Sequence, residues 1–329
     1  MNALGTSSPL ARPAAPAIRR LAPLVILGLL ALLPVATTLG LPSHWLTLVT
    51  RAMIFAIAAL SLDLILGVGG LVSFGHAAFI GIGAYGAGIL ITEGRTELLI
   101  ALPLILIVCA AFAAVTGYVS LRTRGVAFIM ITLAFGQMAF YFAQALSAYG
   151  GDDGLTLYEK STFLGREIFA NRTGFYYIAL GTLAGCYWLA RRLVASRFGR
   201  VLRASRENSV RVTVTGYDVD HVRLGAYIIS GMMAGLSGFL LANQTDFVSP
   251  AFMSWQRSGE LIFMVVLGGV GSLYGAIVGA IALLAVEDVL SALTQNWKAI
   301  FGPMIVLFVL FTRGGIAGMA ARLGGRRDG

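Results

Sequence analysis

Several stretches of this chain run for 18 residues or more without a charged side chain, and five of them are expected to be single spans. A helix needs roughly 20 apolar residues to cross the hydrocarbon core of a bilayer. Hydrophobic residues make up 58% of the 329 and charged residues only 12%, which is too little polar surface for a water-soluble protein of this length. We therefore expect an all-α polytopic membrane protein. The five spans are 21–40, 98–121, 125–151, 173–190 and 224–245.

Glycine interrupts two further apolar stretches, so we expect each of them to form two segments. The stretch 51–91 contains a glycine cluster at 67–70, and a second cluster separates 258–269 from 272–290. Glycine weakens a helix, and discontinuous helices in membrane proteins can surround a substrate path. With a short last span at 299–312, the expected total is about ten transmembrane segments, some of them short or discontinuous.

Basic residues are concentrated in a few connecting segments. The loop 191–223 holds eight arginines against three acids, and the positive-inside rule assigns such a segment to the cytoplasm. An even number of spans places both ends of the chain on that side and 150–173 outside. The expected organisation is a disordered cytoplasmic tail at 1–20, a single transmembrane domain at 21–312, and a basic cytoplasmic tail at 313–329. The charge is sorted by topology, so nucleic acid is not an expected partner.

His76 lies in an apolar stretch close to Ser73. An unpaired polar side chain is costly within a membrane, which leaves two interpretations: hydrogen bonding inside the bundle, or a position beside a wet route. No histidine or cysteine stands at ligand spacing from His76, so a metal site is not expected. Asp63 and the pair Glu287 and Asp288 fall near expected segment ends, where carboxylates can reach interfacial water; a proton relay is the alternative.

Part of the loop 191–223 has the spacing of an amphipathic helix that would lie parallel to the membrane. A helix of this kind either contacts anionic lipid alone or docks on a cytoplasmic partner. Its apolar stripe comprises Val201, Leu202, Ala204 and Ser205, and its basic stripe comprises Arg200, Arg203 and Arg206.

Four separated motifs now coincide. They are 62–67 leading into 71–85; 124–128 with 132–136 and 150–155; 196–208 with Gly216; and 267–275. In this order and spacing they resemble the permeases of ABC-type branched-chain amino-acid uptake systems, specifically the larger of the two homologous permease subunits. The resemblance covers about residues 50–312.

The resemblance implies a multi-chain importer in a bacterial inner membrane. Its other components would be a smaller homologous permease, two cytoplasmic ATPase subunits and a periplasmic substrate-binding protein. This chain would be no enzyme and would bind no cofactor, with ATP hydrolysed by the partner subunits. Its two lysines, Lys160 and Lys298, lack the glycine-rich setting that a P-loop requires.

The expected cargo is a small polar solute, with branched-chain or related amino acids first. Urea, short amides and small carboxylates are the alternatives within the family, because Gln137 stands where many relatives carry an acid. A proton-coupled secondary carrier is a weaker alternative, since it does not explain a basic cytoplasmic helix followed by a glycine turn.

The resemblance also indicates two sets of site residues. The candidates for the translocation path are Ser73, His76, Phe135 and Gln137. The candidates for coupling to an ATPase subunit are Arg203, Arg206, Glu207, Asn208 and Gly216. We expect the segment 203–208 to be a helix whose charged side chains hydrogen-bond across that contact, and Gly216 to let the chain turn back toward the next span.

Overall fold

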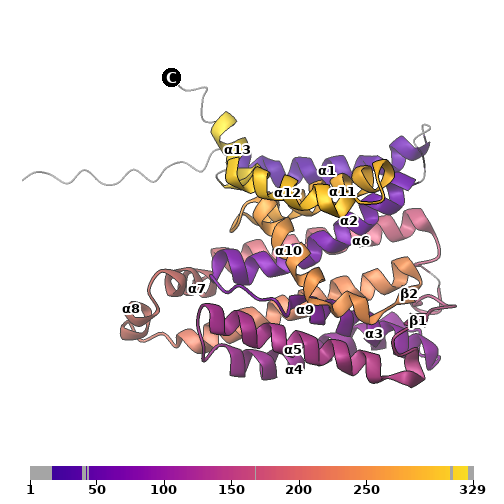
Figure 1. Ribbon diagram of the computed structural model, residues 1–329, viewed down its shortest axis with the longest axis horizontal. Coiled ribbons are helices and arrows are strands. Elements are labelled where there is room, and N and C mark those ends of the chain that lie inside the picture. Colours follow the sequence, from indigo (N-terminus) through magenta and orange to yellow (C-terminus); the bar gives the residue numbers. More distant parts are fainter. Residues whose placement is uncertain (1–16, 39–41, 43, 167, 312–313, 325–329) are drawn as a thin grey trace, which may run out of the picture.

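The computed structural model describes residues 17–38, 42, 44–166, 168–311 and 314–324 (Figure 1). Within this part of the chain ten helices form the body of the molecule, and most of them run along one direction. They are α1 (Ala17–Thr38), α2 (His44–Asp63), α3 (His76–Thr92), α4 (Leu98–Ser120), α5 (Val126–Ala145), α6 (Arg172–Ala195), α9 (Val219–Thr245), α10 (Trp255–Gly268), α11 (Leu273–Leu293) and α12 (Trp297–Phe311). Each expected segment corresponds to one of these helices.

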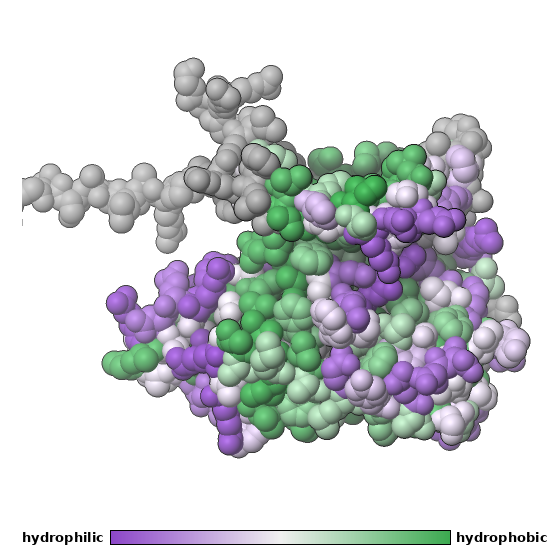
Figure 2. Space-filling view, in the orientation of Figure 1, coloured by the Kyte–Doolittle hydropathy of each residue, from purple (hydrophilic) through white to green (hydrophobic). Residues whose placement is uncertain are grey.

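Five described helices are long and apolar enough to cross a membrane. Shorter apolar stretches lie in α1, α3 and α12. Figure 2 shows apolar residues over much of the middle of the molecule and hydrophilic residues gathered at its two ends. The expectation of an all-α membrane protein is confirmed at this level. The five spans are His44–Val68, Leu98–Ser120, Val126–Ala145, Val219–Thr245 and Leu273–Leu293.

The first interruption lies where the glycines predicted it. Helix α2 continues into a π-helical turn, η1 (Leu64–Val68), and the chain is then non-helical from residue 69 to 75, before α3 begins at His76. In Figure 1 this segment leads from the end of the bundle near α7 toward its middle. Single π-helical turns occur frequently at functional sites, which makes this junction a candidate site.

The second interruption is a tight turn between α10 and α11. Gly269 has a φ of 111° and Gly271 a φ of 80°, and residues that carry a Cβ rarely adopt such backbone angles. Helix α10 has 14 residues, so at 1.5 Å per residue it spans about 21 Å. That is less than the roughly 30 Å of a hydrocarbon core. Both glycine clusters therefore produce the short or discontinuous helices that the sequence predicted.

Helices α2, α3 and α9 form the centre of the bundle, and α3 lies unusually close to α9. A Cβ on Gly83 would lie 2.0 Å from the carbonyl oxygen of Gly235, and a Cβ on Gly238 would lie 1.9 Å from that of Ile80. Small residues let helix backbones approach each other in membranes. These glycines therefore have a packing role that no larger residue can fill without moving a backbone.

Two expected boundaries differ from the observed ones. Helix α5 ends at Ala145 and not near residue 151, because a 3-10 turn, η2 (Ser147–Tyr149), and the left-handed Gly150 follow it. Helix α6 continues past residue 190 to Ala195, because long arginine side chains at a helix end can extend away from the apolar surface. The guanidinium of Arg192 lies over the ring of Trp188, 5.3 Å from its centroid.

The two ends of the bundle carry different elements. At one end α7 (Arg197–Glu207) and α8 (Ser209–Val214) project as a basic arm, and at the other β1 (Leu155–Thr156) pairs with β2 (Phe247–Val248) in a short antiparallel ladder that we did not predict (Figure 1). Part of the expected C-terminal tail forms α13 (Gly315–Gly324), which packs on α10 and α11. Helix α1 already begins at Ala17, and the rest of the expected 1–20 tail lies outside the described residues.

Candidate functional site

His76 is the first residue of α3 and is fully buried. The hydroxyl of Ser61 on α2 donates to the carbonyl of Ala58 at 2.7 Å, and Nε2 of His76 lies 2.8 Å from the same hydroxyl oxygen. Because Ser61 has one proton to give, we assign the imidazole proton to Nε2. Nδ1 of His76 is then a buried acceptor without a partner among the described residues, and the Ser73 side chain is also fully buried. The path candidates Ser73 and His76 thus both lie inside the subunit, three positions apart in the sequence.

The segment before α3 lies against α5. The backbone N–H of Phe74 donates to Oγ1 of Thr132 at 3.3 Å, and a Cβ on Gly75 would lie 2.2 Å from the carbonyl oxygen of Thr132. Gly136 also contacts Gly75, and its half-buried neighbours are the other two path candidates, Phe135 and Gln137. The structure therefore brings both pairs of path candidates to the contact between this segment and α5. Their role in transport stays a prediction.

Asp63 does not reach interfacial water, and that expectation was wrong. The residue is fully buried, and its Oδ1 accepts a hydrogen bond of 2.7 Å from the N–H of Gly271 in the turn between α10 and α11. A Cβ on Gly67 would lie 2.4 Å from the nitrogen of Gly271. The two interruptions of the bundle therefore contact each other, with Asp63 as the polar link. The available signal for its burial was a carboxylate within an apolar stretch, four residues before a glycine cluster.

The basic arm is attached to the first interruption by Arg206. Its guanidinium Nη1 donates to the carbonyl of Gly67 in η1 at 2.5 Å, and its aliphatic carbons lie against Gly70. Leu202, on the same side of α7, is fully buried and contacts Gly69. Leu202 therefore anchors the arm within this subunit and offers no apolar surface to a partner.

A second arginine, which the sequence analysis did not single out, attaches the arm to α9. Arg223 is 7% exposed, and its Nη2 donates to the carbonyl of Ser205 at 2.8 Å while its Nε donates to the Ser205 hydroxyl at 3.3 Å. The available signal was an arginine at the start of an apolar span. Helix α7 is therefore attached both to η1 and to α9.

The other coupling candidates face away from the bundle. Arg203, Glu207 and Asn208 are exposed, but the helix ends at Glu207 and not at Asn208 as expected. Asn208 has extended backbone angles, and its side chain accepts from the N–H of Arg211 at 3.0 Å to cap the unpredicted helix α8. Gly216 has a φ of 88° and makes the turn that the sequence predicted.

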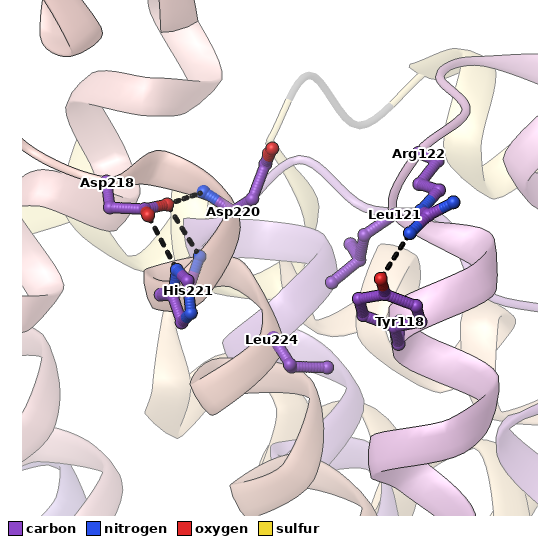
Figure 3. Close-up of a pocket in the computed structure, with 7 residues that line it drawn as sticks. All are labelled: Tyr118, Leu121, Arg122, Asp218, Asp220, His221 and Leu224. Atoms are coloured by element: carbon purple, nitrogen blue, oxygen red, sulfur yellow. Dashed lines mark hydrogen bonds and ion pairs between the residues drawn. The ribbon is translucent and has the colours of Figure 1, made fainter.

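A pocket of about 270 Å³ lies between the end of α4 and the start of α9 (Figure 3). Asp218 caps α9: its Oδ1 accepts from the N–H groups of Asp220 and His221, both at 3.1 Å, and its Oδ2 lies 2.6 Å from Nδ1 of His221. The hydrogen bonds from His221 hold the pKa of the Asp218 carboxyl below its ordinary value of 3.8. Across the pocket Arg122 donates to the Tyr118 hydroxyl. The cap fixes the point where the chain returns from the arm to the bundle.

Comparison with known proteins gives matches along most of the chain. The family described as "Branched-chain amino acid transport system / permease component" matches residues 44–310. The high-affinity branched-chain amino acid transport system permease protein LivM of Salmonella typhimurium is 28% identical, over 82% of this chain and 69% of LivM. LivM of Escherichia coli K12 is 27% identical over the same shares. LivH of Salmonella typhimurium is 25% identical, over 80% of this chain and 90% of LivH.

No solved structure gives a significant match. The family match begins at the first residue of α2 and ends within α12. It therefore includes both helix interruptions, the basic arm and every candidate residue described above. This chain belongs to the family of branched-chain amino acid transport system permease components.

Proposed function

We propose that this chain is a LivM-type permease subunit of an ABC importer that moves branched-chain amino acids from the periplasm to the cytoplasm. Its partners are a LivH-type permease, two ATPase subunits and a periplasmic binding protein. Relatives of both names match over about four fifths of the chain, which supports a paired arrangement of two homologous permeases. The chain contributes the path and the coupling surface, and the ATPase subunits bind and hydrolyse ATP.

The attachment of the basic arm to η1 is the observation that carries this proposal. Arg206 joins the arm to Gly67, and Asp63 joins the same region to Gly271. A force applied to the arm by an ATPase subunit thus reaches both discontinuous parts of the bundle without crossing flexible chain. Switching between outward and inward access needs such a bistable, packed connection. Ser73, His76, Phe135 and Gln137 lie where the resulting movement of α3 against α5 would occur.

The orientation proposed for the chain has the basic arm in the cytoplasm, with all ten helices embedded in the inner membrane. The arm carries most of the arginines of the loop 191–223, in agreement with the positive-inside rule. Helix α13 lies toward the same end of the bundle as the arm (Figure 1), which supports a cytoplasmic C-terminus. The domain 21–312, with coupling loop 191–223, is then one transmembrane unit between two cytoplasmic tails.

Reconstitution tests the proposal. Proteoliposomes containing this chain, the partner permease and both ATPases, supplied with the binding protein, should accumulate radiolabelled leucine only when ATP is present inside. Excess unlabelled isoleucine or valine should compete, whereas urea should not. Competition by urea or a short amide alone would move the substrate to another branch of the family. ATP-independent uptake by this chain alone would contradict the importer assignment.

A further inference from the structure

Four charged side chains lie within helices that contribute to the body of the bundle. Arg51 is on α2, Arg257 and Glu260 are on α10, and Glu287 is on α11. We call these four residues the charged hollow. In Figure 2 hydrophilic residues lie between the layer of α11 and α12 and the layer of α4 and α5. In the sequence, Arg51, Arg257 and Glu260 resemble connecting charges because each lies at the edge of an apolar run.

The four charges are close to one another. Nη1 of Arg257 donates to Oε2 of Glu260 at 2.6 Å. The guanidinium carbons of Arg51 and Arg257 lie 5.8 Å and 5.5 Å from the ring centroid of Phe55, so both cations flank one aromatic ring. Glu287 interacts electrostatically with Glu260, Arg51 and Arg257, and also with Lys298 at the start of α12. Two cations and two anions thus form one cluster, with Lys298 at its edge.

The charged hollow lies below the outer end of the helices. Trp45 in the first turn of α2 is 41% exposed, and Trp297 begins α12; tryptophan is enriched at membrane interfaces. Arg51 follows Trp45 by six residues, which along a helix is about 9 Å. Charged groups at such a depth face water or protein and do not face lipid. The surface that carries this cluster is therefore not a lipid-facing surface.

The cluster is also accessible from outside the chain. The side chains of Arg257 and Glu260 are 23% and 35% exposed, whereas the polar residues at the centre, such as Asp63 and His76, are fully buried. The charges of this pair are therefore partly open to a molecule outside the chain.

We propose that the charged hollow binds the ammonium and carboxylate groups of an amino acid as it passes through the membrane. This inference rests on the proposed importer function and adds the residues that recognise the common part of the substrate. The planar guanidinium groups of Arg51 and Arg257 match a carboxylate, which they can bind with two parallel hydrogen bonds. The carboxylates of Glu260 and Glu287 accept from the ammonium group.

Exchange of partners keeps the charges paired throughout. Without substrate, Arg257 and Glu260 bind each other; with substrate, Arg257 turns to its carboxylate while Glu260 turns to its ammonium group. A zwitterion brings no net charge, so the cluster of two cations and two anions stays balanced. Because unpaired charge is costly in a low-dielectric site, this arrangement favours zwitterions over solutes with a single charge. The four residues bind only the ammonium and carboxylate groups, so the aliphatic side chain of the substrate does not affect this contact.

Neutralising either member of the pair tests the inference in the reconstituted importer. We expect Arg257→Gln and Glu260→Gln each to lower leucine uptake at least tenfold, while co-purification with the partner permease and ATPases is unchanged. The matched control is Asp288→Asn, which removes the ion pair between Asp288 on α11 and His44 on α2 and should leave uptake unchanged. Uptake at the wild-type rate by both Gln variants would overturn the inference.

Labelling with a thiol reagent tests access independently of transport. In a background with Cys109 and Cys186 replaced by alanine, Glu260→Cys or Gln256→Cys should react with both cationic and anionic membrane-impermeant thiosulfonates added outside. Leu29→Cys, on the exposed face of α1, should not react. If a charge variant fails to assemble, the labelling result alone decides whether the cluster is accessible from outside. Unreactive cysteines at 256 and 260 would show that the partner permease covers the hollow, which would overturn the inference.

The two proposals fail in different ways. If the importer containing the unmodified chain does not transport leucine, the proposed function is wrong whatever the variants do. If it transports leucine and the Arg257→Gln and Glu260→Gln variants transport equally well, only the charged hollow is wrong. A further expectation separates binding from folding: the exchanged variant Arg257→Glu with Glu260→Arg should assemble fully, and it should recover part of the lost uptake.

Discussion

The centre and the edge of this bundle are built from helices of similar length but opposite environment. Across their most apolar windows, α2 with η1 is 94% buried and α9 is 67% buried, whereas α4 and α5 are each 22% buried. The order of hydropathy does not follow burial: α4 is the most apolar of the five spans and α9 the least apolar. In this chain an apolar residue is thus a poor indicator of the core.

The difference follows from the solvent. Lipid is as apolar as leucine, so helix association in a bilayer depends on close packing and hydrogen bonds more than on apolar burial. The centre accordingly holds glycines and serines, such as Ser230, whose hydroxyl donates to the carbonyl of Ser61 at 2.5 Å. The edge of α4 presents leucine, isoleucine and valine to the outside. Substitutions at the centre and the edge should therefore have unequal effects.

The largest effect is expected where α3 contacts α9. A Cβ on residue 238 would lie 1.9 Å from the carbonyl oxygen of Ile80, so Gly238→Leu forces the two helices to separate. We expect a loss of about 3 kcal/mol in the free energy of unfolding, at the upper end for overpacking. Gly185→Leu on α6, where a Cβ meets nothing within 4 Å, is the matched control. Thermal unfolding in detergent measures both, and equal losses would contradict the comparison.

A smaller effect is expected at the link between the two interruptions. Asp63→Ala removes the acceptor of the hydrogen bond from the N–H of Gly271, which costs about 1.5 kcal/mol, the upper end for the net contribution of a hydrogen bond. Asp63→Asn keeps an acceptor oxygen and should lose less. Unfolding measurements on both variants give the order. If alanine and asparagine destabilise equally, the hydrogen bond to Gly271 is not what requires a polar residue at this position.

Most of the helices could be predicted from the sequence, because span length and charge are local properties. The glycine clusters at 67–70 and 268–271 also predicted both interruptions. What could not be predicted is that the two interruptions contact each other. Asp63 and Gly271 lie 208 positions apart, and no local pattern pairs them. Their contact depends on how α2 packs against α11.

The candidate sites were less predictable than the helices. The arm was recognised as amphipathic, but the stripes alone could not tell which side faces the bundle. Leu202 is buried against Gly69, and Arg206 reaches Gly67, while Glu207 remains exposed. The end of α7 was missed because Asn208 caps the next helix. Side chains that bind their own chain and those that can bind a partner have the same spacing in the sequence.

This division of the arm gives a third prediction, in which two neighbouring residues have separable effects. Arg206→Ala should lower transport per ATP hydrolysed by roughly tenfold, the equivalent of about 1.4 kcal/mol of coupling, while ATPase subunits still bind. Glu207→Ala should instead weaken ATPase binding. Co-purification and the ratio of leucine uptake to phosphate release measure the two effects. Arg203→Ala, exposed on the same helix, should behave as Glu207→Ala does.

Opposite results for the two residues would reverse the assignment of the two faces of the arm. Identical defects in Arg206→Ala and Glu207→Ala would mean that the arm moves as a rigid docking element without a specific connection to Gly67. Full ATPase binding and full uptake by a double variant of Arg206 and Glu207 would leave the arm as a basic helix that contacts lipid alone.

The smallest effect is expected at the end of the bundle, where Asp218 caps the central helix α9 in open solvent. Hydrogen bonds from His221 lower the pKa of this carboxyl in the folded protein below the ordinary 3.8. A carboxyl whose pKa is lower in the folded protein than in the unfolded chain stabilises the fold at pH values above its unfolded pKa. This stabilisation is lost as the pH falls through the folded pKa. Asp218→Ala should therefore unfold slightly earlier than the unmodified chain at neutral pH, and the two should converge at a pH below 3.8. The control is Asp153→Ala, which removes an exposed carboxylate that makes no hydrogen bond among the described residues. Its stability should equal that of the unmodified chain at both neutral and acidic pH. A gap between Asp218→Ala and the unmodified chain that widens in acid would mean that the cap acts through the protonated carboxyl, contrary to the hydrogen bonds that it accepts from the backbone.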